Sequence, residues 1–456
     1  MADEKRLVIA GGVAGGTAAA SRARRVDPGL KIDIYQKGPY ISYSACLMPY
    51  YIGDIATSNE LSKYIVRPPQ VFKDGHDIDI HLQHEVLSID TKARETLIKD
   101  IRNDRTMTVP YDTLIISTGA RSRSLNIPGD DAPNVFYIKE LSDAEKIKRF
   151  IYQKKPSRAV TLGAGFIGLE MAEAFGHLGI QNTMLYRGAK PMGRLGDDIS
   201  EMIIGEVEEH GVRFVPDASA SSFTLDSDGM VISVVSDKGE FPTDMVLVSV
   251  GVIPNTEIAK AAGLALGKSS ALSVDDHQRT SDKYIYAAGD CCEVLHRITG
   301  KPVFVPLGDL ANKQGWVAGE NAAGGDVTYP GIFGSAHFKV FDLEVGFTGL
   351  SCVEAEREGI DYVAHTIEGR SKPRLYPGSS LIRVCLVAEK KTRRLLGAQI
   401  AGRDGAAHRI NIMAAALAGN LTIEDVVDLD LAYAPPFTPT IDPILTAARV
   451  LQKDMG

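Results

Sequence analysis

The chain has 456 residues, which exceeds one ordinary domain and suits about three. Its net charge of -8 argues against a nucleic-acid-binding protein, and its hydrophobic content of 44% is typical of a soluble globular protein. No apolar run reaches the roughly 18 residues of a membrane span. The charged start Met1–Arg6 leads directly into a strand rather than a signal peptide, so we expect a cytoplasmic protein.

The first predicted unit is a strand, a glycine turn and a helix. Strand Arg6–Ala10 leads into the turn Gly11–Gly16, and a helix is predicted over Thr17–Val26. Glycines let the backbone approach a pyrophosphate, and the helix N-terminus offers free N–H groups. Val13 replaces the middle glycine of the usual dinucleotide-binding pattern, and Gln36 stands where an acid often binds a ribose hydroxyl.

The same pattern returns about 150 residues later, after strand Arg158–Leu162, where the turn Gly163–Gly168 has all three glycines. The second strand of this unit is predicted over Asn182–Arg187. It carries Tyr186 and Arg187 where an NAD site usually has an acid. An arginine there favours the 2′-phosphate of NADPH, with NADH left open. The spacing predicts that one dinucleotide fold is inserted in another, which resumes near Thr280–Asp290.

Cys46 stands alone, because the next cysteine in the chain is Cys291. A redox-active Cys46 must therefore form its disulfide with a molecule outside the chain; the alternative is a buried structural thiol. Ring strain argues against a disulfide between the neighbours Cys291 and Cys292. Cys352 and Cys385 lie in apolar, strand-like runs and are predicted to be packing residues. The histidines show no metal-ligand spacing, so no metal is expected.

Three further motifs, Ser117–Ala120, Ser249–Asn255 and Tyr284–Asp290, accompany the two glycine turns. Together they resemble the flavin-dependent pyridine nucleotide-disulfide oxidoreductases, over nearly the whole chain. The specific resemblance is to the single-cysteine branch, which contains coenzyme A-disulfide reductases, NAD(P)H persulfide reductases, NADH oxidases and NADH peroxidases. It implies FAD at the first glycine turn and NADPH or NADH at the second.

The resemblance also implies roles for individual residues. Asp290 should hydrogen-bond the ribityl chain of FAD, Phe166 should cover the flavin, and Glu170 should lie near the nicotinamide ribose. The implied FAD contacts are Gly11, Gly12, Val13, Ala14, Gly16, Gln36, Lys37, Thr118, Gly119 and Asp290. The implied NAD(P)H contacts are Gly163, Gly165, Phe166, Ile167, Gly168, Glu170, Tyr186, Arg187 and Gly251.

The implied fold is α/β, with two Rossmann-like dinucleotide-binding domains and a C-terminal α+β dimerisation domain. Residues 1–121 and 271–328 are expected to form the FAD-binding domain, residues 122–270 the NAD(P)-binding domain, and residues 329–456 the interface domain of a homodimer. By the resemblance, Tyr433 reaches the active site of the partner subunit, and Tyr376 is a second such tyrosine.

Members of this branch differ in the substrate that exchanges electrons with the cysteine. Oxidases and peroxidases carry a histidine where this chain has Ala14, which favours the reductases of coenzyme A disulfide or related small disulfides and persulfides. Ala45 replaces the usual asparagine beside Cys46, so the disulfide substrate is left open. A further alternative is a flavin reductase that passes electrons to a protein partner while Cys46 is idle.

Coenzyme A, as substrate or as a mixed disulfide on Cys46, needs phosphate contacts. Arginine suits phosphate through its planar fork of donors, and the alternative for a helical arginine pair is a solvated surface stripe. The expected substrate contacts are Arg22, Arg25, Ser42 and Arg67.

Overall fold

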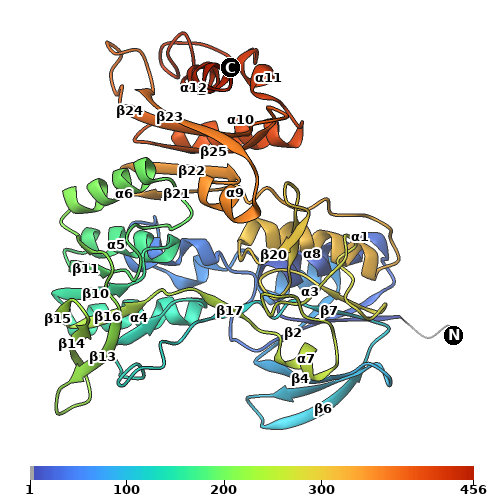
Figure 1. The fold of residues 1–456 in the computed structure, drawn as a ribbon. Helices are drawn as coiled ribbons and strands as arrows, with labels where there is room; N and C mark the ends of the chain where they lie inside the picture. The colour runs from blue at the N-terminus through green and yellow to red at the C-terminus, as the bar shows by residue number, and fades with distance from the viewer. Residues whose placement is uncertain (1–4) are drawn as a thin grey trace.

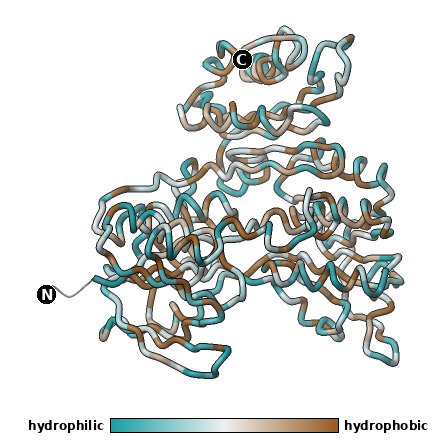
Figure 2. Tube along the Cα trace, turned by 180° about the vertical axis from the view of Figure 1, so that it is seen from behind, coloured by the Kyte–Doolittle hydropathy of each residue, from teal (hydrophilic) through white to brown (hydrophobic). Residues whose placement is uncertain are grey.

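The computed structural model describes residues 5–456, so the first four residues of the charged start lie outside the described residues. Figure 1 shows two lower modules side by side and a C-terminal module above them. Figure 2 shows the same arrangement from behind. Within residues 5–456, no helix is both long and apolar enough to cross a membrane.

The first module is built on a five-stranded parallel sheet of order β18-β7-β1-β2-β3. Helices pack against one face of this sheet, and a small antiparallel sheet with a short helix packs against the other. The strands are β1 (Arg6–Ala10), β2 (Lys31–Gln36), β3 (Ile78–Leu82), β7 (Thr113–Ile116) and β18 (Ile285–Ala287). The helices are α1 (Ala14–Val26), α2 (Met48–Ile52), α3 (Pro69–His76) and α8 (Gly308–Ala322), with short 3-10 helices over Ala45–Leu47 and Leu61–Tyr64.

Helix α1 begins at Ala14, three residues before the predicted start at Thr17. This earlier first turn packs closely against α8. A Cβ on Gly315 would lie 2.3 Å from the carbonyl oxygen of Gly15, and a Cβ on Gly319 would lie 2.2 Å from that of Ala19. Small residues on both helices thus bring their backbones together, and the second half of the glycine turn becomes the first turn of α1.

The second module has a parallel sheet of order β12-β11-β10-β16-β9. Strand β11 ends at Leu185, earlier than predicted, so Tyr186 and Arg187 lie just beyond it. The strands are β9 (Val135–Tyr137), β10 (Arg158–Leu162), β11 (Gln181–Leu185), β12 (Arg213–Val215) and β16 (Met245–Val248). The helices are α4 (Leu141–Lys154), α5 (Phe166–His177) and α6 (Asp197–Glu209).

Both lower modules also contain small antiparallel sheets. One three-stranded sheet is β4 (His84–Asp90), β5 (Glu95–Asp100) and β6 (Arg105–Pro110), and another is β13 (Ala220–Leu225), β14 (Val231–Ser236) and β15 (Gly239–Pro242). The two crossings between the modules pair as β8 (Ala120–Ser122) and β17 (Val252–Pro254). The remaining elements are helix α7 (Glu257–Ala261) and the pair β19 (Val294–His296) and β20 (Lys301–Val303).

The C-terminal module is a five-stranded antiparallel sheet of order β21-β22-β25-β24-β23 with helices on both faces. The strands are β21 (Ala336–Val340), β22 (Leu343–Gly349), β23 (Tyr362–Arg370), β24 (Leu381–Glu389) and β25 (Leu395–Gly402). The helices are α9 (Cys352–Glu358), α10 (Ala406–Ala418), α11 (Ile423–Val427) and α12 (Pro443–Asp454). The predicted fold class is confirmed, whereas the boundaries at residues 121, 270 and 328 stay predictions.

Candidate active site

Cys46 lies in the 3-10 helix that precedes α2, and its side chain is exposed. A Cβ built on Gly308 would lie 3.9 Å from the Cys46 sulfur, so the thiol stands beside the first residue of α8. The loop that carries the thiol is tied to the first glycine turn, because the Ser42 backbone N–H donates to the Gly12 carbonyl at 2.9 Å. Ser42 itself has a positive φ of 47°. The thiol therefore stands where the glycine turn and the N-terminus of α8 converge.

Charged groups around Cys46 set the acidity of its thiol. Although one side of Cys46 is open to solvent, the protein packed around its sulfur partly desolvates it and raises its pKa, and the negative charge of Glu170 adds to the effect. Lys139 lowers this pKa, while Asp290 and Asp309 raise it. Lys139 also forms an ion pair of 2.6 Å with Asp290. The chain by itself thus holds Cys46 mainly as a thiol, and Lys139 is the cation that opposes this.

The pKa of Glu170 is itself raised. Burial, together with the nearby carboxylate of Glu173, raises the pKa of Glu170 to about 7. Glu173 accepts a hydrogen bond of 3.0 Å from the Phe341 backbone N–H of the C-terminal module. Helix α5 thus places one carboxyl toward the thiol and anchors the neighbouring one to the C-terminal module.

Replacing Glu170 by glutamine should lower the pKa of the Cys46 thiol, because a neighbouring negative charge disfavours the thiolate. The rate at which iodoacetamide alkylates Cys46, followed as a function of pH, measures that pKa. Lys139→Met is the matched control: it removes a cation and should raise the pKa. If both substitutions moved the pKa in the same direction, the charge arrangement described here would be wrong.

The first glycine turn has the features of an anion site. Helix α1 has no acidic residue in its first turn and no side-chain cap, so its first N–H groups have no capping oxygen. The Gly12 N–H donates to the side-chain oxygen of the buried Gln36 at 2.8 Å. Lys37 instead pairs with Glu85 at 2.8 Å. The uncapped N–H groups of α1 fit the pyrophosphate of FAD, and the contacts predicted from the turn stay predictions.

The second glycine turn also leaves room for a ligand. A Cβ added to Gly165 would meet no atom within 4 Å, whereas one on Gly168 would lie 2.2 Å from the Gly163 carbonyl oxygen. The backbone is therefore open at Gly165 and closely packed at Gly168. Phe166 follows directly, and its ring packs against Phe338 at 5.4 Å between centroids. The open cradle at α5 fits a dinucleotide.

Other predicted cofactor residues surround the two crossings between the lower modules. Gly119 and Gly251 both have positive φ, and a Cβ added to either would meet nothing within 4 Å. The Thr118 hydroxyl donates to the Asn255 carbonyl at 2.6 Å. Ile167 is partly buried against the core that contains α2, and Arg187 is exposed. The structure describes their positions, and their cofactor contacts stay predictions.

The predicted substrate arginines differ in their surroundings. Arg22 forms an ion pair with Glu320, and its guanidinium lies over the ring of Trp316, 4.2 Å from the centroid. Arg25 and Arg67 are exposed. A phosphate at Arg22 would thus have to compete with Glu320 for the guanidinium, a constraint that helical spacing does not reveal.

Tyr376 and Tyr433 are both on the surface of the C-terminal module, with exposed fractions of 37% and 49%. Exposed tyrosines in adjacent loops suit contact with a second subunit, since aromatic residues are enriched at protein interfaces. Their roles at the thiol stay predictions.

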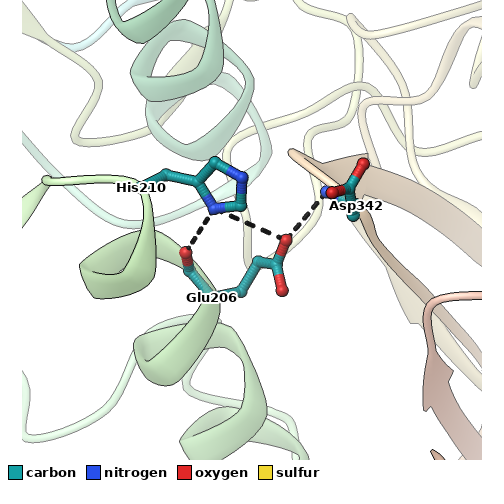
Figure 3. A group of neighbouring side chains, drawn as sticks. All are labelled: Glu206, His210 and Asp342. Carbon is teal, nitrogen blue, oxygen red and sulfur yellow. Dashed lines mark hydrogen bonds and ion pairs between the residues drawn. The ribbon is translucent and has the colours of Figure 1, made fainter. Parts of the chain in front are cut away.

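Glu206, His210 and Asp342 form one of two groups of side chains among residues 5–456 that could hold a metal ion (Figure 3). Glu206 is buried, and it accepts from Arg403 at 2.8 Å and from the Asp342 backbone N–H at 2.8 Å. The His210 ring stacks on Phe341 with 4.1 Å between centroids. A guanidinium thus already neutralises the Glu206 carboxylate, and the group joins α6 to the C-terminal module.

Comparison with known protein families agrees with this geometry. Residues 5–308 match the family model described as pyridine nucleotide-disulphide oxidoreductase, and residues 335–443 match its dimerisation domain. The chain belongs to this family. The match confirms a pyridine nucleotide-disulphide oxidoreductase that uses FAD and NAD(P)H, and the dimerisation domain supports a homodimer.

Three relatives of this pyridine nucleotide-disulphide oxidoreductase span nearly its whole length. The NAD(P)H coenzyme A polysulfide/persulfide reductase of Pyrococcus horikoshii is 36% identical over 454 residues, covering 98% of this chain and 99% of the relative. A NAD-dependent persulfide reductase from A. fulgidus has a TM-score of 0.95 at 36% identity, covering 98% of this chain and 83% of that chain. Reduced Bacillus anthracis CoADR-RHD has a TM-score of 0.95 at 33% identity, covering 99% and 81%.

Sequence reasoning missed Lys139 in the oxidoreductase. It follows β9 in the second module, pairs with Asp290 of the first module, and lowers the pKa of Cys46 through its charge. No local motif marks this lysine. Its position near the thiol is revealed by its ion pair with Asp290, and this pair joins two distant segments that come together only in the folded chain.

Proposed function

We propose that this protein is an NAD(P)H-dependent reductase of coenzyme A disulfide or related small disulfides and persulfides, acting through Cys46. The observation that carries the proposal is an exposed, unpaired thiol between two dinucleotide cradles. The relatives named as coenzyme A persulfide and coenzyme A disulfide reductases support it.

The two glycine turns would hold the cofactors. The free N–H groups at the start of α1 suit the pyrophosphate of FAD, Gln36 would lie at a ribose hydroxyl, and the cradle at Gly165 suits NAD(P)H. When bound, FAD supplies the two-electron relay between nicotinamide and thiol. Asp290 would exchange part of its contact with Lys139 for a hydroxyl of the cofactor.

Cys46 performs the thiol chemistry. Its thiolate attacks one sulfur of the disulfide, the sulfur–sulfur bond breaks, and one thiol leaves. The resulting mixed disulfide on Cys46 then accepts two electrons that originate in NAD(P)H and releases the second thiol. The net change is one NAD(P)H, one proton and one disulfide converted to NAD(P)⁺ and two thiols.

Other residues of the chain assist this exchange. Lys139 favours the Cys46 thiolate that leaves when the mixed disulfide is cleaved. Tyr433 of the partner subunit would hydrogen-bond the thiolate or protonate the departing thiol, and Tyr376 of the partner subunit would support it. Ser42, Arg22, Arg25 and Arg67 are the proposed substrate contacts.

A direct test is anaerobic turnover with coenzyme A disulfide. We expect two thiols to form per NAD(P)H oxidised, counted by chromatography against the fall in absorbance of the reduced nicotinamide. Parallel reactions with dioxygen and with hydrogen peroxide, but without disulfide, should be much slower. NAD(P)H oxidation that occurred only with dioxygen or peroxide would instead support the oxidase or peroxidase alternative.

Arg187→Glu should shift the preference of the enzyme from NADPH toward NADH. The side chain is exposed just beyond β11, and among residues 5–456 no ion pair engages it. An acid there would repel the 2′-phosphate and accept from a ribose hydroxyl. The ratio of kcat/KM for NADPH to that for NADH is expected to fall by about tenfold or more, or about 1.4 kcal/mol. An unchanged ratio would show that Arg187 does not contact the cofactor.

A further inference from the structure

Cys352 and Cys385 form a second thiol pair in the C-terminal module. Sequence patterns place both in strand-like runs, but Cys352 is the first residue of helix α9 and only Cys385 lies in a strand, β24. Val384 and Leu386 face the core beneath α10 and α12, so Cys385 faces the opposite side of the sheet. There the half-buried Cys352 packs against it.

The helix that carries Cys352 lies at the junction of the three modules. Glu354 of α9 pairs with Arg194 of the second module at 3.1 Å, and Glu358 pairs with Lys301 of the first at 2.6 Å. Figure 1 shows α9 between the C-terminal sheet and the two lower modules. A chemical change at Cys352, the first residue of α9, would therefore occur where the three modules meet.

The two thiols interact unequally. A side-chain hydrogen bond with Cys385 lowers the pKa of Cys352 to about 7, and the Tyr362 hydroxyl contributes to the same effect. The contact with Cys352 and burial raise the pKa of Cys385. Cys352 is partly exposed whereas Cys385 is buried beneath it, so an incoming disulfide reaches Cys352 first, and the lowered pKa favours its thiolate, which is the nucleophile. Cys385 is in position to resolve an adduct.

We propose that Cys352 and Cys385 are a thiol–disulfide site for low-molecular-weight disulfides, separate from Cys46. The Cys352 thiolate attacks one sulfur of the incoming disulfide, whose sulfur–sulfur bond breaks and whose first thiol leaves. The Cys385 sulfur, after losing its proton to solvent, then displaces the second thiol from Cys352. The two cysteines are oxidised by two electrons to one disulfide, and the incoming disulfide is reduced to two thiols.

Mass spectrometry of the holoenzyme tests this proposal without turnover. The protein is incubated with glutathione disulfide in the absence of NAD(P)H, alkylated and digested with trypsin. We expect the peptides Val340–Arg357 and Val384–Lys390 to be linked, with a mass two hydrogens below their sum. The link should disappear on treatment with dithiothreitol.

Variants separate the two steps. Cys385→Ala should trap glutathione on Cys352, because the resolving thiol is absent, and Cys352→Ser should show neither adduct nor link. The Cys46→Ser variant should form the same link as wild type, so this site is distinguished from the proposed reductase activity. If Cys352 and Cys385 both stayed free for alkylation while Cys46 carried glutathione, the second site would be disproved.

Discussion

Replacing Cys46 by serine is expected to reduce NAD(P)H-dependent reduction of coenzyme A disulfide by at least about a thousandfold in kcat. A serine hydroxyl neither attacks a disulfide nor leaves from it as an anion at neutral pH. No other described cysteine replaces it at this site, since Cys291 and Cys292 are buried and donate to backbone carbonyls. Steady-state disulfide reduction under argon measures the loss.

Hydride transfer provides the internal control. In the Cys46→Ser variant, anaerobic bleaching of the flavin by NAD(P)H should stay within about twofold of wild type, because Cys46 acts only after this step. Cys352→Ser serves as a matched thiol variant and should keep the reductase activity. Coenzyme A disulfide reduction that survived in Cys46→Ser would favour the alternative in which Cys46 is idle and electrons pass to a protein partner.

The fold was predictable because its signals are local. Each glycine turn lies between a strand and a helix, and the family match confirms the two dinucleotide-binding units. The errors occur at element ends. Gly15 and Gly16 read as parts of a turn but belong to α1. Their lack of side chains makes room for neighbouring groups, since a Cβ on Gly15 would lie 2.7 Å from the Ser117 hydroxyl and one on Gly16 would lie 1.9 Å from the Gly11 carbonyl oxygen.

The candidate site was less predictable because it assembles from distant segments. The Cys46 thiol lies beside the first residue of α8, far along the chain, and feels the charge of Lys139 from the second module. Arg22 matched a surface stripe or a phosphate contact equally well, and only the folded chain shows its pairing with Glu320. Periodicity likewise does not show that Cys352 begins a helix and faces Cys385.

Arg409→Met is expected to destabilise the protein by about 3–5 kcal/mol, because it leaves the buried Asp442 carboxylate without its cation. Arg409 and Asp442 pair at 2.9 Å, and both side chains are less than a tenth exposed. The guanidinium also donates to the carbonyls of Ser371 and Phe437, each at 3.2 Å. Arg409 therefore links two segments of the C-terminal module: the one that precedes Tyr376 and the one that follows Tyr433.

Denaturant unfolding of the holoenzyme, followed through the C-terminal module, measures this cost. Arg383→Met is the control, because its pair with Glu368 is 3.4 Å long and its side chain is 29% exposed. It also loses a bond of 2.8 Å to the Asp198 carbonyl, but it leaves no carboxylate buried without a cation, so it should cost clearly less than Arg409→Met. Combining Arg409→Met with Asp442→Asn removes the orphaned charge and should recover part of the stability. No recovery would mean that packing of the arginine, rather than its charge, holds the tyrosine segments in place.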